Sequence, residues 1–344
     1  MPKLTRREFA VALQLPAIAP ALGTLRSFGP SDRPPRKVIV GTVIQYYGGG
    51  KYPGVEARLA ELVKIIDRVA EESRKQYGRG PDLVVLPELI VTREAPGPLP
   101  FEGSVRKTFS ETAVRHHSYI VVPMALLEDG KDYNAAVLVG RRGEVAGIYR
   151  KLHLAVVTGS DSMEGGRTPG KEVPVFECDF GKVGAQICFD MEFDYGWDEL
   201  ARQGAELVVW PSASPQTARP ASRALQHGYY IVSSTPRHNA SVFEPTGRIA
   251  AQVKAPERIL VTEVDLSYAI LPWSPQLRNG ATLAEKYGDK VGFHYYEEED
   301  HGIFWSNDSK IPIGQMTRSV GLPDARSELS RVRKLYHKAG VPSY

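Results

Sequence analysis

Three reactive side chains in this sequence each follow a run of apolar residues. Glu88 comes after the first run, Lys151 after the second and Cys188 after the third. A cysteine thiolate can attack an electrophilic carbon, a carboxylate can remove the thiol proton, and a nearby cation can stabilise the negative charge that develops. Taken singly, the three residues have ordinary alternatives: a helix cap, a surface charge and a buried core cysteine. Together they indicate covalent catalysis through a cysteine.

The segment that carries Cys188 has the pattern of a strand followed by a helix. Residues 183–187 alternate between apolar and small or polar side chains, which predicts a strand with one buried face. Residues 194–203 predict a helix. A thiol at the turn between them is held rigidly, near backbone N–H groups that can stabilise negative charge. The same position also suits an inert buried cysteine, so the prediction of reactivity depends on its partners.

Strands and helices alternate through most of the chain from residue 37. Helices are expected at 55–69, 105–117, 194–204 and 219–228, and strands at 37–44, 82–86, 119–122, 134–139, 144–149, 183–187, 206–210, 229–234 and 259–263. Such alternation with several hairpins predicts α/β layers rather than a parallel barrel. Because open α/β folds gather strand ends at one rim, we expect Glu88, Lys151 and Cys188 to meet there.

Composition excludes several classes of protein. The 344 residues are 42% hydrophobic and 24% charged, as in a soluble globular protein. A net charge of +3, with lysine and arginine dispersed along the chain, argues against a nucleic-acid partner. Two cysteines, Cys178 and Cys188, are too few for a disulfide scaffold. A single bridge is not expected either, because a hairpin turn at 178–182 would place the two cysteines at opposite ends of one strand.

The two ends of the chain differ in pattern from its middle. Residues 1–30 resemble a twin-arginine signal peptide and linker, with Arg6-Arg7 before a mildly apolar run that is too short to span a membrane. Export to the periplasm or outside the cell is the expectation, and a cytoplasmic location follows if the signal is not used. Residues 37–265 form the expected domain. Residues 266–344 read as a loop-rich extension that closes with a helix and packs on the domain or on a partner subunit.

Three motifs resemble those of the carbon–nitrogen hydrolase (nitrilase) superfamily. They are Leu-Pro-Glu-Leu at 86–89, Tyr-Arg-Lys-Leu-His-Leu at 149–154 and Ile-Cys-Phe-Asp-Met-Glu-Phe at 187–193. The resemblance covers residues 37–265 and includes the order and spacing of the motifs. It implies a four-layer α-β-β-α sandwich that pairs into homodimers or larger homo-oligomers.

The resemblance also implies a role for each motif residue. Glu88 is the expected general base, Cys188 the nucleophile, and Lys151 the cation that lowers the pKa of the thiol and stabilises the oxyanion, with the Phe189 backbone N–H as a second donor. Members of the family often carry a second glutamate between the lysine and the cysteine. Glu164 is the best candidate, with an ordinary loop glutamate as its alternative.

Further residues are candidates for contact with the substrate. Phe189 lies directly after the nucleophile, Asn134 begins a predicted strand, and Trp210 ends another. Trp210 fits a pocket wall and core packing equally well. Glu192 could select a cationic substrate, although a carboxylate at a helix start is the simpler explanation.

The histidines are interpreted mainly as structural. His153 lies two residues after Lys151, but a Cys–His pair would make Glu88 and Lys151 superfluous, and His227 falls on a predicted helix. His294 and His301 flank the acidic run 297–300, yet the set lacks tight metal-ligand spacing, and a solvated acidic loop is the simpler interpretation. No metal or other cofactor is expected.

The prediction is therefore an enzyme that hydrolyses non-peptide carbon–nitrogen bonds of small amides or N-carbamoyl compounds through a cysteine thioester. The sequence Cys-Phe-Asp at 188–190 resembles the amidase-like branch more than true nitrilases, so nitriles are less favoured substrates. An acyltransferase that uses the same thioester and a catalytically silent binding relative remain alternatives. A Cys–His protease is the least favoured.

Overall fold

The first strand shows how the chain builds separate cores. The computed structural model describes residues 33–156, 158–323 and 325–342. In β1 (Lys37–Val43), Val38 and Val40 face one hydrophobic cluster and Ile39 faces another. Successive side chains of a strand point to opposite faces, so an apolar strand of this kind must be covered on both sides.

Two six-stranded sheets supply these faces. The first has the order β12-β1-β2-β3-β4-β5 and the second the order β11-β10-β9-β8-β7-β6. In the first sheet β1 joins β2 (Leu83–Val85), β3 (Tyr119–Glu128), β4 (Lys131–Val139), β5 (Val145–Arg150) and β12 (Ile259–Asp265). The second contains β6 (Val175–Cys178), β7 (Gly181–Ala185), β8 (Leu207–Pro211), β9 (Tyr230–Ser234), β10 (Asn239–Phe243) and β11 (Ile249–Lys254). Each sheet has three parallel strands, β1-β2-β3 and β7-β8-β9, extended by antiparallel ones.

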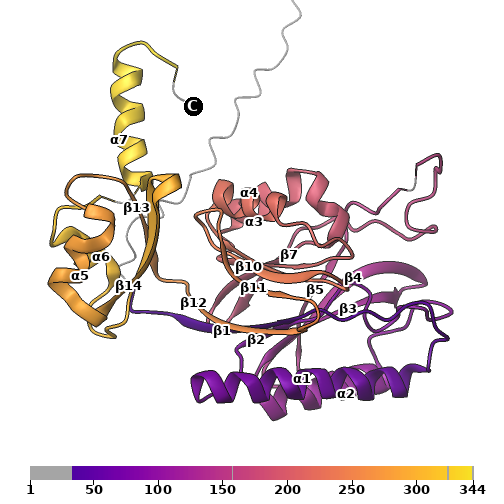
Figure 1. Ribbon diagram of the computed structural model, residues 1–344. Coiled ribbons are helices and arrows are strands. Elements are labelled where there is room, and N and C mark those ends of the chain that lie inside the picture. The colour runs from indigo at the N-terminus through magenta and orange to yellow at the C-terminus, as the bar shows by residue number, and fades with distance from the viewer. Residues whose placement is uncertain (1–32, 157, 324, 343–344) are drawn as a thin grey trace, which may run out of the picture.

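Helices cover the outer face of each sheet, and Figure 1 shows the resulting layers. Against the first sheet lie α1 (Val55–Tyr77) and α2 (Gly103–His116), and against the second lie α3 (Tyr195–Gln203) and α4 (Ala218–His227). The apolar face of α1 consists of Leu59, Leu62, Ile66 and Val69, all buried. Between the sheets lies an interlayer core of buried residues from both of them. The predicted α-β-β-α sandwich is confirmed.

The C-terminal residues form more structure than the sequence analysis predicted. A three-stranded sheet, β13-β15-β14, is built from β13 (Tyr268–Pro272), β14 (Val291–Tyr296) and β15 (His301–Ser306). With α5 (Ala281–Tyr287) and α6 (Ile313–Arg318) it encloses a hydrophobic cluster of its own, and α7 (Ala325–Lys338) projects from this unit (Figure 1). The expectation of a loop-rich extension is wrong, because the Pro, Trp and Tyr residues of this region lie in or next to short paired strands.

The predicted export segment and the question of membrane-spanning helices concern different parts of the chain. The twin-arginine segment at residues 1–30 lies outside the described residues. Across the described ranges, no helix combines enough length and enough apolar character to cross a membrane.

Candidate active site

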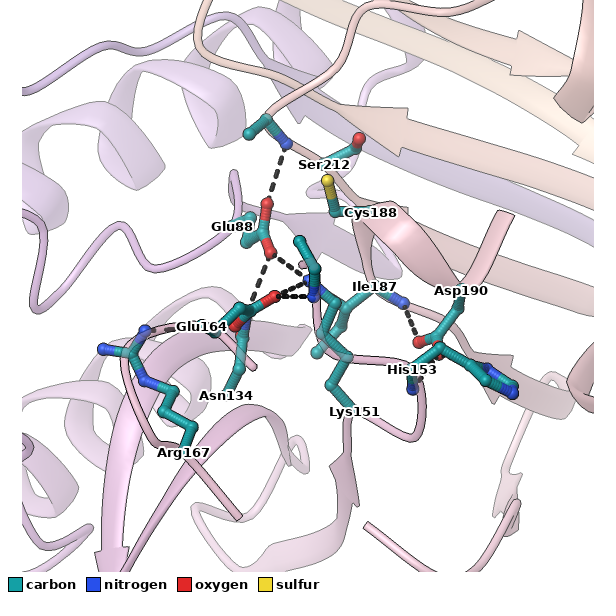
Figure 2. Close-up of polar contacts among 12 residues, drawn as sticks. Glu88, Asn134, Lys151, His153, Glu164, Arg167, Ile187, Cys188, Asp190 and Ser212 are labelled. Atoms are coloured by element: carbon teal, nitrogen blue, oxygen red, sulfur yellow. Dashed lines mark hydrogen bonds and ion pairs between the residues drawn. The ribbon is translucent and has the colours of Figure 1, made fainter. Parts of the chain in front are cut away.

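The candidate site lies where strand ends of both sheets meet. Glu88 follows β2 and Lys151 follows β5, both in the first sheet. Cys188 follows β7 and Ser212 follows β8, both in the second sheet. Figure 2 shows these side chains converging. The cluster therefore joins the two sheets at one end of the interlayer core.

Glu88 is a buried carboxylate with four partners. Its Oε1 accepts hydrogen bonds from Lys151 Nζ at 2.9 Å and from Asn134 Nδ2 at 2.8 Å. Its Oε2 accepts one from the Ala213 backbone N–H at 2.9 Å, and the neighbouring Cys188 side chain contributes to lowering the pKa of the carboxylate. This set fixes the carboxylate next to the sulfur while satisfying its charge.

Lys151 is 1% exposed and pairs with two carboxylates. Besides Glu88, its ammonium group contacts Oε1 of Glu164, which also accepts the Ala155 backbone N–H at 3.1 Å. Arg167 lies 3.9 Å from the other oxygen of Glu164. The structure thus places Glu164 beside Lys151, as expected of a second glutamate that orients the lysine.

Asn134 connects the two glutamates. It is fully buried on β4, and its amide nitrogen donates to Glu88 at 2.8 Å and to Glu164 Oε2 at 3.0 Å. Its backbone carbonyl accepts the N–H of Lys151 at 2.8 Å. Asn134 therefore contacts two carboxylates and the backbone of Lys151, and its predicted contact with the substrate stays a prediction.

Cys188 begins a short 3-10 helix, η1 (Cys188–Glu192), with φ of 42°. Non-glycine residues seldom adopt this left-handed conformation, which costs about 1–3 kcal/mol and is enriched at functional sites. Glu164 has a similar φ of 43°. The indole N–H of Trp210 donates to the Cys188 carbonyl at 3.2 Å and so helps to fix the strained turn.

Asp190 fastens the cysteine turn to the lysine segment. Its Oδ2 accepts the Ile187 N–H at 2.9 Å and the Tyr149 hydroxyl at 2.7 Å. Its Oδ1 accepts the backbone N–H of His153 at 2.9 Å and lies 3.0 Å from the ring Nδ1 of the same residue (Figure 2). His153 is thus engaged with Asp190, in line with its structural interpretation.

The charge states of the three central groups follow from their mutual contacts. Burial alone would raise the pKa of Glu88, but Lys151, Asn134 and the thiol outweigh it and hold that pKa below its usual value. Burial alone would lower the pKa of Lys151, but the surrounding negative groups, Glu88 first, raise it above its usual value. At neutral pH the glutamate is ionised and the lysine is protonated.

The pKa of the Cys188 thiol depends on the balance between burial and the neighbouring charges. Burial, aided by the charge of Glu88, raises the pKa of Cys188 to about 12. Lys151 lowers this pKa, as predicted, but its effect is smaller than that of burial, so the net shift is upward. At neutral pH Cys188 is therefore a neutral thiol, and any attack by its sulfur would require the loss of that proton.

The remaining substrate candidates are placed as follows. Phe189 is half-buried, with its ring 5.8 Å from that of Phe193, and its role at the substrate stays a prediction. Trp210 is fully buried in the core beneath α3 and α4, which corrects its prediction as a pocket wall. Glu192 is paired with Arg219, whose hydrogen bond lowers its pKa. That pairing neutralises the charge proposed to select a cationic substrate, so this prediction is also corrected.

The other residues singled out in the sequence lie elsewhere. Both cysteines are free thiols, as expected. His227 packs on Tyr229, with ring centroids 5.4 Å apart. His294 lies 3.2 Å from Glu244, at the junction between the β10–β11 hairpin and the C-terminal unit. Within the described part of the chain, no group of three or more His, Cys, Asp or Glu residues is arranged to hold a metal ion.

Sequence reasoning missed two residues at the site. Asp190 is placed by four donors from segments that only the fold brings together, and a pattern of spacing does not reveal that. Ser212 had a usable signal, because it directly follows a strand, as the other reactive residues do. The assembled group can accept a thiol proton, stabilise an oxyanion and return the proton to a leaving group.

Comparisons with known proteins identify the family of this chain. The family model described as carbon–nitrogen hydrolase matches residues 42–271. The omega-amidase of Danio rerio is 29% identical over 240 residues, which is 60% of this chain and 86% of that protein.

Solved structures show the same fold. The crystal structure of Nit3 from Saccharomyces cerevisiae, a member of branch 10 of the nitrilase superfamily, has a TM-score of 0.56 at 24% identity and covers 67% of this chain and 90% of that one. A double mutant of the amidase from Nesterenkonia sp. AN1 in complex with acrylamide has a TM-score of 0.55 at 17% identity, with 67% and 91% covered.

Proposed function

Because this chain belongs to the carbon–nitrogen hydrolase family of the nitrilase superfamily, we propose that it hydrolyses amide bonds of small molecules through a thioester on Cys188. One observation carries the proposal. Glu88, a buried and ionised carboxylate, accepts a hydrogen bond from the Lys151 ammonium group at 2.9 Å and lies beside the Cys188 side chain, which helps to lower its pKa (Figure 2). That is the arrangement needed to move a proton away from sulfur and to balance the charge that forms.

The first half-reaction makes the thioester. As the sulfur of Cys188 attacks the amide carbon, the thiol proton passes to Glu88, and the carbonyl oxygen becomes an oxyanion. Lys151 and the Phe189 N–H are the proposed partners of that oxyanion. When the C–N bond breaks, Glu88 gives its proton to the departing nitrogen, and ammonia or an amine leaves.

The second half-reaction releases the acid. Glu88, again ionised, accepts a proton from water as the water oxygen attacks the thioester carbon. The C–S bond then breaks, the carboxylic acid forms, and the proton on Glu88 returns to sulfur. Glu164 and Asn134 hold Lys151 and Glu88 in place throughout, so the same set of residues acts in both half-reactions.

Amides are the favoured substrates within the carbon–nitrogen hydrolases. Two of the three relatives named above are an omega-amidase and an amidase whose double mutant was solved in complex with acrylamide, which supports a simple amide as the substrate class. N-carbamoyl compounds, which carry the same amide carbon bonded to a second nitrogen, are the second candidate. Nitriles remain less favoured.

The direct test measures ammonia release by the purified full chain from a panel of aliphatic amides, N-carbamoyl amino acids and nitriles. We expect release from amides and a loss of at least a thousand-fold in Cys188→Ala, because covalent catalysis requires the thiol. Cys178→Ala is the matched control, since Cys178 is a second free, mostly buried thiol on the β6–β7 hairpin. Full activity in Cys188→Ala would refute the thioester.

The same assay separates the alternatives. Hydroxylamine or a primary amine added to the reaction yields an acyl-transfer product if the thioester prefers an acceptor other than water. A silent binding relative would release no ammonia from any amide, and Cys188 would resist alkylation. Either outcome would replace hydrolysis as the function.

A further inference from the structure

Ser212 is a fully buried residue at the end of β8, and Figure 2 shows its hydroxyl beside the sulfur of Cys188. Its backbone N–H donates to the Ser234 carbonyl at 2.9 Å, which ties it to the next strand. The following residue, Ala213, donates its N–H to Glu88. Ser212 is therefore held rigidly between the nucleophile and the segment that contacts the general base.

The hydrogen bonds of this hydroxyl determine where its proton points. The Ser214 backbone N–H donates to Ser212 Oγ at 3.0 Å, so the oxygen acts there as an acceptor. A buried hydroxyl keeps one proton to donate and needs an acceptor for it. The Cys188 sulfur is such an acceptor, and the contact between the two side chains lowers the pKa of the thiol.

We propose that Ser212 is a further catalytic residue, whose hydroxyl donates a hydrogen bond to the Cys188 sulfur and stabilises the thiolate while Glu88 takes its proton. This proposal rests on the proposed function. The thiol proton moves to the Glu88 carboxylate, the Ser212 proton stays on Oγ, and the sulfur gains the full negative charge that this hydrogen bond then stabilises.

A neutral donor suits this position for an electrostatic reason. Burial and the charge of Glu88 both oppose the thiolate, and the charge of Lys151 is shared between two carboxylates. A second cation beside the sulfur would help the thiolate but would also lower the pKa of Glu88 further and weaken it as a base. A hydroxyl that donates its proton to the sulfur stabilises the thiolate without adding a charge that would weaken Glu88 as a base.

Alkylation of Cys188 by iodoacetamide tests the contact without any substrate. Labelling is followed at pH 8 by mass spectrometry of the Cys188 peptide, so that Cys178 is not counted. In Ser212→Ala we expect a roughly ten-fold smaller thiolate fraction, offset by about three-fold greater nucleophilicity, and hence labelling about three-fold slower. Ser118→Ala is the control, because it also removes a fully buried hydroxyl that hydrogen-bonds, but outside the site.

Steady-state kinetics on an amide then tests the catalytic role. We expect Ser212→Ala to lower kcat roughly ten-fold or more with KM little changed, and Ser212→Thr, which keeps the hydroxyl, to recover most of the loss. Thermal melting of each variant shows whether it is folded. Wild-type labelling and wild-type kcat in a folded Ser212→Ala would overturn the proposal, and so would equal slowing in Ser118→Ala.

The two proposals can fail separately. If amide hydrolysis needs Cys188 but Ser212→Ala labels and turns over like the wild type, the proposed function stands and the role of Ser212 falls. If no amide is hydrolysed, the proposed function falls, and the labelling rates alone still show whether Ser212 acts on the sulfur.

Discussion

Among single residues, Asn134 shows how an uncharged side chain can act on the charged groups of the site. It carries no charge, yet its amide contacts Glu88 and Glu164, and its carbonyl holds the backbone of Lys151. A hydrogen bond to an ionised carboxylate favours that ionised form. Asn134 therefore helps to decide at which pH the general base is available.

Removing that amide should move the acidic limb of the pH profile. Glu88 must be ionised to accept the thiol proton, so kcat/KM falls as pH drops through the pKa of Glu88, which lies below its usual value. In Asn134→Ala one of the groups that lowers this pKa is gone while burial remains. We expect the acidic limb to shift to higher pH and kcat/KM at neutral pH to fall roughly ten-fold.

The control for this change is Asn239→Ala. Asn239 is also buried, but its amide donates to the Pro215 carbonyl at 3.0 Å. Its pH profile should keep the wild-type acidic limb. If Asn134→Ala also keeps the wild-type limb, then Asn134 does not set the ionisation of Glu88.

Residue types and spacing were sufficient to select Glu88, Lys151 and Cys188 as candidates, because each follows an apolar run, and the family resemblance added Glu164. They were not sufficient to give the direction of the thiol pKa. That direction depends on how much water each group loses and on how the charge of Lys151 is divided, and only the folded arrangement determines both. The same holds for Glu192, whose partner Arg219 comes from a separate helix.

Among the elements, the turn at η1 and the segment after β5 depend on one another through Asp190. This carboxylate is fully buried and accepts four hydrogen bonds from the two segments. It therefore sets the separation between the segment that carries Cys188 and the segment that carries Lys151.

Replacing Asp190 by Asn should loosen both segments. An amide has one oxygen to accept hydrogen bonds and presents N–H groups to donors where the carboxylate had its second oxygen. We expect the free energy of unfolding to fall by about 2–4 kcal/mol and kcat/KM to fall by roughly ten- to a hundred-fold. Urea denaturation and steady-state kinetics measure the two effects.

Asp194→Asn is the matched control, since Asp194 follows the same turn but is exposed and pairs with Arg223. We expect its stability to change by about 0–1 kcal/mol. Equal losses in the two variants would show that Asp190 has no special role in this turn.

Most of the elements could be predicted from apolar periodicity, including α1, β1 and the β4–β5 hairpin. The C-terminal strands were missed because the apolar runs of β13 and β14 are short and carry aromatic residues next to prolines and glycines. Short strands of this kind are stabilised by pairing with a neighbouring strand, and the sequence of one strand alone says little about that pairing.

In the molecule as a whole, the C-terminal unit is joined to the sandwich by packing as well as by the chain. Trp305 of β15 is half-buried against the interlayer core, and Lys37 Nζ lies 5.4 Å from the centre of its ring. Arg36 donates to the Leu266 carbonyl at 2.7 Å and to the Ser267 hydroxyl at 3.1 Å, in the segment that leads from β12 into β13. The C-terminal unit thus covers one end of the interlayer core.

Two tryptophans of this unit allow a matched test of that contact. We expect Trp305→Ala to lower the free energy of unfolding by about 2–3 kcal/mol, because a half-buried indole leaves the core, whereas Trp273→Ala should change it by about 0.5 kcal/mol at most. Trp273 is 55% exposed. Denaturant titrations of the two variants give the values, and equal stabilities would show that the unit contributes nothing to the sandwich.

Two further properties of the whole chain stay predictions. Assembly into homodimers or larger homo-oligomers can be measured by light scattering of the purified protein. Export through the twin-arginine segment can be measured by fractionating cells that express the full chain. Neither property follows from the apolar patterns that predicted the layers, because both depend on partners of the chain.

Glu88, the proposed general base, and Cys188, the proposed nucleophile, follow strands of different sheets, and the apolar layer between the sheets therefore acts as a spacer that would set the distance for proton transfer. Sheets packed face to face lie about 10 Å apart, and a single added methylene can shift them. Ala136 and Ala185 are buried on opposite sides of this layer. The thickness of the core, usually considered only for stability, is in this molecule also a dimension of the reaction centre.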